Sequence, residues 1–165
     1  MLIELVVVVA IMAVMIGLGS YSLSMIASTN AKECTQELNL ALVSTRTKSY
    51  SSDSATKEPV SLKVYKKSDG IYIKKSFETE EKKIGGAKVR VYYKLSGETS
   101  YTEMVSANEG EAKTLEFSFN RSSGAFRPVK LDGTTAGACQ SMQIISGNKV
   151  YTITCHQKTG KITVE

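Results

Sequence analysis

The sequence predicts an α+β protein in which one long N-terminal helix packs on a C-terminal antiparallel β-sheet or sandwich domain. Three observations carry this prediction. The chain begins with an apolar run, continues with helical spacing of apolar residues, and then alternates with a period of two between turn sequences. With 165 residues, 42% of them hydrophobic and 22% charged, it is long enough to bury one modest core.

The distribution of charge divides the chain into parts. Residues 5–31 carry no charge, and Glu4 is the one charged residue that precedes this run. From Ser28 the pattern becomes amphipathic, so one helix is expected from about Leu2 to Lys48. We therefore expect a hydrophobic half-helix over 1–27, an amphipathic half-helix over 28–50 and a β-rich globular domain over 51–165.

The globular domain is predicted to contain about seven to nine short strands. The turn sequences Lys67-Ser68-Asp69-Gly70 and Ser146-Gly147-Asn148 each separate two alternating runs, so two hairpins are expected. In the second hairpin, we expect Ser146 to pair with Lys149. The runs that read as strands are Val60–Val64, Ile71–Ile73, Lys88–Tyr93, Leu115–Phe119, Gln143–Ile145, Val150–Ile153 and Lys161–Val164.

The first residues carry a resemblance to a known family. Leu2-Ile3-Glu4-Leu5, followed by Val6–Val9, resembles the N-terminal methylation motif of type IV prepilins and type II secretion pseudopilins. An isolated acid at the head of an apolar run is otherwise rare, because a charge in apolar surroundings is costly. The resemblance implies cleavage by prepilin peptidase ahead of this motif, with Met1 at the second mature position. It also implies that Glu4 pairs with the N-terminal amine of a neighbouring subunit and sets its register in a filament.

Residues 1–31 have three possible interpretations. A cleavable signal peptide would need a basic N-terminal region and a small-residue cleavage site, and neither is evident. The segment is long enough to span a membrane as a plain transmembrane anchor. The family resemblance instead implies a helix that lies in membrane lipid only before assembly. We therefore expect a single-pass protein of the cytoplasmic (inner) membrane with its N-terminus toward the cytoplasm. Its C-terminal domain would be extracytoplasmic, in a periplasmic or cell-surface filament after assembly.

Two glycines interrupt the apolar half of the predicted helix. Gly17 and Gly19 each cost roughly 1 kcal/mol relative to alanine in a helix interior. They permit local melting of the helix in a filament, or they allow close helix packing. The sequence favours neither role over the other.

Segments of the globular domain resemble minor pseudopilins of the GspH/FimT type. The matching segments are Pro59–Leu62, Leu115–Gly124 and Gln157–Val164. This resemblance implies a structural subunit of a type II secretion pseudopilus or a type IV pilus, without enzymatic activity and without a cofactor. Its partners would be other pilins or pseudopilins and the inner-membrane assembly platform.

The alternative function is that of a DNA-binding, competence-type minor pilin. Family members of that kind are associated with a basic closing segment, which suggests Lys158 and Lys161 as nucleic-acid contacts here. Thr163 replaces the second basic residue of that segment, which puts DNA binding in doubt. The net charge of +5 and the lysine pairs near tyrosines agree with phosphate contact and base stacking, but more often mark a solvated strand face.

Three cysteines form an odd set without CxxC spacing, so no metal site is expected. Cys139 and Cys155 flank the second hairpin and form a candidate disulfide, although the expected register places Cys155 opposite Gln140. A bridge from Cys34 to either of them, or none, remains open. His156 follows Cys155 and suggests a Cys/His nucleophile, but no orienting acid or oxyanion donor is evident, so no catalytic residues are expected.

Overall fold

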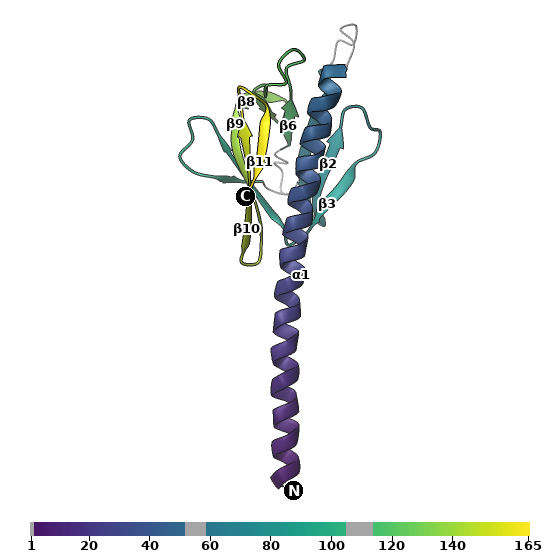
Figure 1. Cartoon of the computed structure of the whole chain (residues 1–165), viewed down its shortest axis with the longest axis vertical. Coiled ribbons are helices and arrows are strands. Elements are labelled where there is room, and N and C mark those ends of the chain that lie inside the picture. The colour runs from purple at the N-terminus through teal and green to yellow at the C-terminus, as the bar shows by residue number, and fades with distance from the viewer. Residues whose placement is uncertain (1, 52–58, 105–113) are drawn as a thin grey trace.

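A computed structural model of the chain describes residues 2–51, 59–104 and 114–165 (Figure 1). The side chains of residue 2 and residues 17–28 are not described. The described chain consists of one helix, α1 (Leu2–Ser51), followed by eleven strands in two antiparallel sheets. Met1 lies outside the described residues, so the prediction that it occupies the second mature position stays a prediction.

The first sheet has six strands in the order β3-β2-β1-β6-β7-β8. Its hairpin β1–β2 closes with Lys67 paired to Gly70, which confirms the predicted turn. The strands are β1 (Ser61–Lys67), β2 (Gly70–Lys75), β3 (Lys82–Gly86), β6 (Leu115–Ser118), β7 (Val129–Leu131) and β8 (Thr134–Gly137).

The second sheet has five strands in the order β11-β10-β9-β4-β5. Ser146 pairs with Lys149, so the predicted register of this hairpin is confirmed. Its strands are β4 (Arg90–Leu95), β5 (Thr102–Glu103), β9 (Cys139–Ser146), β10 (Lys149–His156) and β11 (Lys161–Val164).

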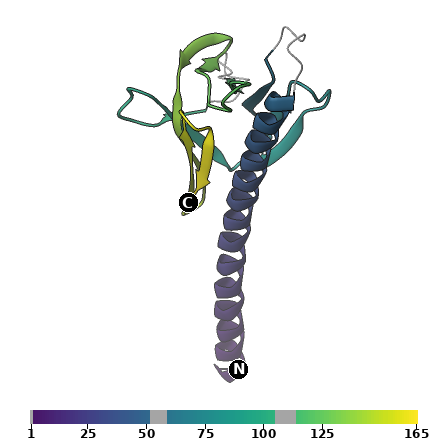
Figure 2. The same ribbon diagram turned by 45° about the horizontal axis from the view of Figure 1, so that its top comes forward.

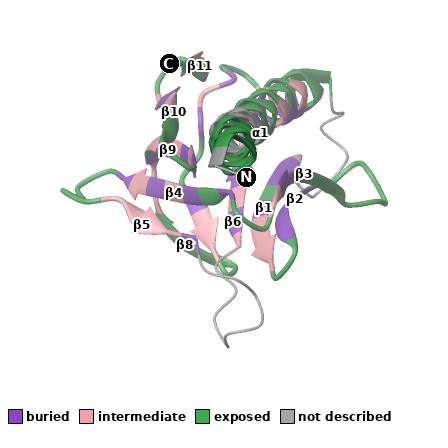
Figure 3. Ribbon diagram, turned by 90° about the horizontal axis from the view of Figure 1, so that it is seen from below, coloured by how far each residue is buried: buried purple, intermediate pink, exposed green. Residues whose placement is uncertain are grey.

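The second half of α1 lies between the two sheets and forms the core with them (Figure 3). Its buried residues recur every three or four positions, which is the spacing of one helix face. Two hydroxyls on this face are satisfied locally, because Thr35 and Thr45 donate to the carbonyl oxygens of Ala31 and Ala41 at 2.7 Å. The buried face comprises Ala31, Cys34, Thr35, Leu38, Ala41, Leu42, Thr45 and Ser49.

The predicted fold class, a long N-terminal helix packed on a sheet or sandwich, is wrong. The helical side chains that the structure describes fall into two stretches, 3–16 and 29–51. Only the second stretch packs on strands, because an amphipathic stripe begins only at Ala31 and residues 3–16 have no polar face opposite an apolar one. The rest of the described chain is β-structure, so the domain is mostly β, with more strands than the turn sequences indicated.

The predicted localisation as a single-pass inner-membrane protein is also wrong. In the part of the chain that the structure describes, no helix is both long enough and apolar enough to cross a membrane.

The C-terminal end of α1 is held by a contact among three distant segments. The Arg46 guanidinium donates from Nη2 to the carbonyl oxygen of Thr159 at 2.9 Å. Gly124 and Gly160 lie against this arginine and against each other, both with left-handed backbone (φ of 63° and 65°). A β-carbon at Gly124 would overlap the Tyr50 hydroxyl, and one at Gly160 would overlap the Gly124 carbonyl. We call this contact the arginine–glycine clamp.

We predict that Gly160→Ala destabilises the domain by at least about 2 kcal/mol. Left-handed backbone costs a non-glycine residue roughly 1–2 kcal/mol, and the β-carbon would also displace backbone of the Gly124 loop. Urea denaturation followed by circular dichroism measures the loss. Gly86→Ala is the matched control, because a β-carbon there meets no atom within 4 Å. Equal stability of the two variants would contradict the clamp.

Candidate functional site

The first half of α1 extends beyond both sheets, as two views agree (Figures 1 and 2). Every residue from Ile3 to Ile16 is exposed, and the exposed fraction of Ile3 reaches 77%. We call residues 3–16 the apolar segment. Its large hydrophobic residues are Ile3, Leu5, Val6, Val7, Val8, Val9, Ile11, Met12, Val14, Met15 and Ile16.

The apolar segment is hydrophobic on all sides. Consecutive residues of a helix point about 100° apart, so Val6–Val9 alone nearly encircle the axis. A helix that is apolar all round is a buried helix, and a large exposed apolar surface marks an interaction site. The second half of α1 differs, because its apolar face is already covered by the sheets. The geometry therefore defines an apolar surface that the described strands leave uncovered on every side.

Glu4 is the one charged residue of the apolar segment. It lies in the first turn of α1, where the unsatisfied N–H groups and the helix dipole favour a negative charge. The side chain is exposed at the end of the helix that points away from the globular domain (Figure 1). Its position leaves the carboxylate accessible to a second molecule that packs along the same helix.

Exposed apolar side chains continue on the second half of α1. Leu40 and Val43 are both exposed. Leu40 lies beside β3, where an ion pair between Lys82 Nζ and Glu37 Oε2, at 2.7 Å, joins the helix to this strand. Because such an exposed pair contributes little stability, the buried face and the arginine–glycine clamp are what orient the apolar segment.

Gly17 and Gly19 lie within the bounds of α1. Their surroundings belong to the stretch whose side chains are not described. Local melting and close helix packing therefore both remain predictions for these two glycines.

The three cysteines are buried, free thiols. Cys139 and Cys155 lie side by side with their side chains hydrogen-bonded, so the structure brings the predicted pair together without a disulfide. The β9–β10 ladder ends at the pair Ser141–Thr154, one step before Cys155 would face Gln140. Cys139 instead pairs with Leu95 of β4. Cys139 and Cys155 are therefore not directly opposite each other, as the register expected from the sequence indicated.

The Cys/His arrangement that the sequence suggested does not form. Neighbouring residues on a strand point to opposite faces, and accordingly Cys155 is buried whereas His156 is exposed. The His156 ring nitrogen Nε2 lies 3.3 Å from the Thr163 hydroxyl on β11. Within the described ranges, no group of three or more His, Cys, Asp or Glu residues could hold a metal ion.

Lys158 and Lys161 are both exposed, in and after the turn between β10 and β11. They lie next to the arginine–glycine clamp, since Thr159 accepts its hydrogen bond from Arg46. The clamp was missed in the sequence because it joins residues more than a hundred positions apart. Its two glycines nevertheless belong to segments that the sequence singled out. Gly124 ends Leu115–Gly124, and Gly160 lies within Gln157–Val164.

Comparisons with known proteins add no assignment to this geometry. The chain matches no family model, no curated protein and no solved structure.

The buried thiols should react very slowly in the folded protein. Burial raises the pKa of the Cys34 thiol to about 12, and the hydrogen bond with Cys155, then burial, raises the pKa of the Cys139 thiol. Near pH 8, a thiol of pKa 12 is only about 10⁻⁴ thiolate, against roughly a quarter for an ordinary cysteine. We expect Cys34 alkylation by iodoacetamide to be at least about a thousandfold slower than in denatured protein, rising about tenfold per pH unit.

Peptide mapping by mass spectrometry, without reductant, measures these rates. Protein denatured before alkylation is the control, in which all three cysteines should be modified equally. Rapid alkylation of native Cys34 would contradict its burial. A peptide cross-linked through Cys139 and Cys155 would show that the pair is oxidised in the isolated protein.

Proposed function

We propose that the chain is a structural subunit that assembles into a filament by packing its N-terminal helix among the helices of neighbouring subunits. The observation that carries the proposal is the apolar segment, which is exposed on every side and projects beyond a folded domain. The resemblance of its first residues to type IV pilins and type II secretion pseudopilins supports the same function. In this proposal, the chain is a minor pilin or pseudopilin.

Burial of the apolar segment supplies the driving force for assembly. Full burial of one Val, Leu, Ile or Met side chain contributes about 1.5–3 kcal/mol, and the segment has eleven such residues. The sum exceeds the roughly 4–15 kcal/mol that association costs in translational and rotational freedom. One neighbour would cover one side only, so a surface apolar all round favours a multi-helix assembly over a dimer.

Glu4 gives this otherwise uniform surface its register. Apolar contacts are nondirectional and tolerate sliding of one helix along another. A carboxylate that must be paired when buried restricts sliding, because breaking a buried pair costs about 3–5 kcal/mol. Its partner in this proposal is the N-terminal amine of the neighbouring subunit, as the family resemblance implies.

Glu4→Ala should reduce incorporation into filaments by on the order of a hundredfold or more, which is the equilibrium change for about 3 kcal/mol. The variant is co-expressed with wild-type subunits, and its share in sheared filaments is measured by quantitative mass spectrometry. The circular dichroism melting curve should be unchanged, because Glu4 lies outside the core.

Glu33→Ala is the matched control for this experiment. It removes a carboxylate from an exposed position of the same helix, beyond the apolar segment. We expect it to be incorporated like the wild type. If Glu4→Ala and Glu33→Ala are incorporated equally, the registration role of Glu4 is lost.

A further inference from the structure

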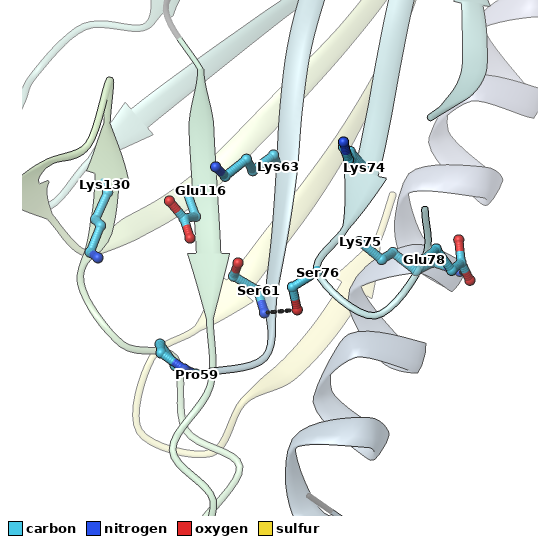
Figure 4. Close-up of a pocket in the computed structure, with 9 residues that line it drawn as sticks. All are labelled: Pro59, Ser61, Lys63, Lys74, Lys75, Ser76, Glu78, Glu116 and Lys130. Atoms are coloured by element: carbon cyan, nitrogen blue, oxygen red, sulfur yellow. Dashed lines mark hydrogen bonds and ion pairs between the residues drawn. The ribbon is translucent and has the colours of Figure 1, made fainter. Parts of the chain in front are cut away.

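A cleft of about 480 Å³ lies on the outer face of the six-stranded sheet (Figure 4). Strands β1, β2, β6 and β7 and the turn after β2 form it, on the side of the sheet that does not contact α1. Its size is in the range of small-molecule sites. The lining residues are Pro59, Ser61, Lys63, Lys74, Lys75, Ser76, Glu78, Glu116 and Lys130.

Strand register places four charged residues of the cleft in one row. Lys74 pairs with Lys63, Lys63 pairs with Glu116, and Glu116 pairs with Lys130. Side chains at paired positions stand about 4.5–5.5 Å apart at their β-carbons and point to the same face. The row therefore brings three ammonium groups and one carboxylate to one surface, as Figure 4 shows.

The pair Lys63–Lys74 destabilises the folded domain when no anion is bound between the two side chains. Like charges directly opposite each other on adjacent strands are destabilising. Among the ion pairs of the described residues, none within 4.0 Å involves Lys63, Lys74 or Lys130. Lys75, in contrast, is paired with Glu78 at 2.9 Å. An anion held between Lys63 and Lys74 would relieve their repulsion.

The charge of the cleft selects the kind of anion. Four lysines against two glutamates leave two positive charges among its lining residues. A phosphate monoester carries about −1.5 to −2 charges near neutral pH, whereas a single carboxylate carries one. Lysine is a common phosphate ligand that acts as a point charge with three donors.

We propose that this cleft binds the phosphate group of a small phosphomonoester. Lys63 and Lys74 contact the phosphate oxygens from two adjacent strands, and Lys130 approaches from the other side of Glu116. The buried Ser61 and its neighbour Ser76, whose Oγ accepts a hydrogen bond from the Ser61 N–H at 2.9 Å, bound the cleft on the Pro59 side. This site lies apart from the apolar segment, so it goes beyond the filament function and does not depend on it.

Isothermal titration of the full chain, kept in solution by a neutral detergent, tests the proposal with inorganic phosphate and glycerol phosphate as probes. We expect saturable binding of both at low salt. Lys63→Gln and Lys74→Gln should each weaken it at least about tenfold, the change for loss of one charge-assisted hydrogen bond. Malonate, a dianion without a phosphate group, should bind more weakly.

Lys149→Gln is the control for net charge. Lys149 is exposed at the β9–β10 turn, on the other sheet, and the substitution removes the same charge. Binding by Lys149→Gln should equal that of the wild type. No binding at millimolar probe, equal weakening in all three variants, or equal affinity for malonate would overturn the proposal.

Discussion

One unbroken helix passes from a covered environment to an uncovered one, and the rest of the structure depends on this change. From Ala31 onward, two sheets cover the apolar face of α1, and the hydroxyls on that face are satisfied within the helix. From Ile3 to Ile16, the side chains are exposed and, apart from Glu4, apolar. The domain is therefore complete as a packed unit at one end of the helix, and it presents an unburied hydrophobic surface at the other.

The globular domain acts on this surface by fixing its direction. Both sheets contact α1, and the arginine–glycine clamp ties the helix end to the Gly124 loop and to the turn before β11. A β-carbon at Gly160 would overlap the Gly124 carbonyl, and one at Gly124 would overlap the Tyr50 hydroxyl, so both segments lie in close contact at the helix end. Rigid attachment matters for assembly because a surface that is fixed before binding loses less freedom on binding.

Local chemistry allowed the two hairpins to be predicted from the sequence, since turn residues determine the register of the strands that flank them. Strands β3, β5, β7 and β8 were missed because they are short and contain few apolar residues, and pairing with other strands stabilises them. The row Lys74–Lys63–Glu116–Lys130 was missed for the same reason, since its members meet only through pairing of β1 with β6 and of β6 with β7. The sequence drew attention to adjacent lysines, whose side chains point to opposite faces of a strand.

The apolar segment and Glu4 were evident from the order of residues alone, whereas the membrane span inferred from them was wrong.

Protection of methionines from oxidation tests most directly whether the apolar segment is buried in an assembly. Met12 and Met15 are exposed in the apolar segment, whereas Met104 and Met142 are fully buried in the core and serve as internal references. Hydrogen peroxide is applied to the isolated subunit and to the assembled filament, and sulfoxide is quantified by mass spectrometry. The account predicts rapid oxidation of Met12 and Met15 in the subunit and strong protection in the filament, with Met104 and Met142 protected in both. Equal oxidation of Met12 and Met15 in the two states would contradict it.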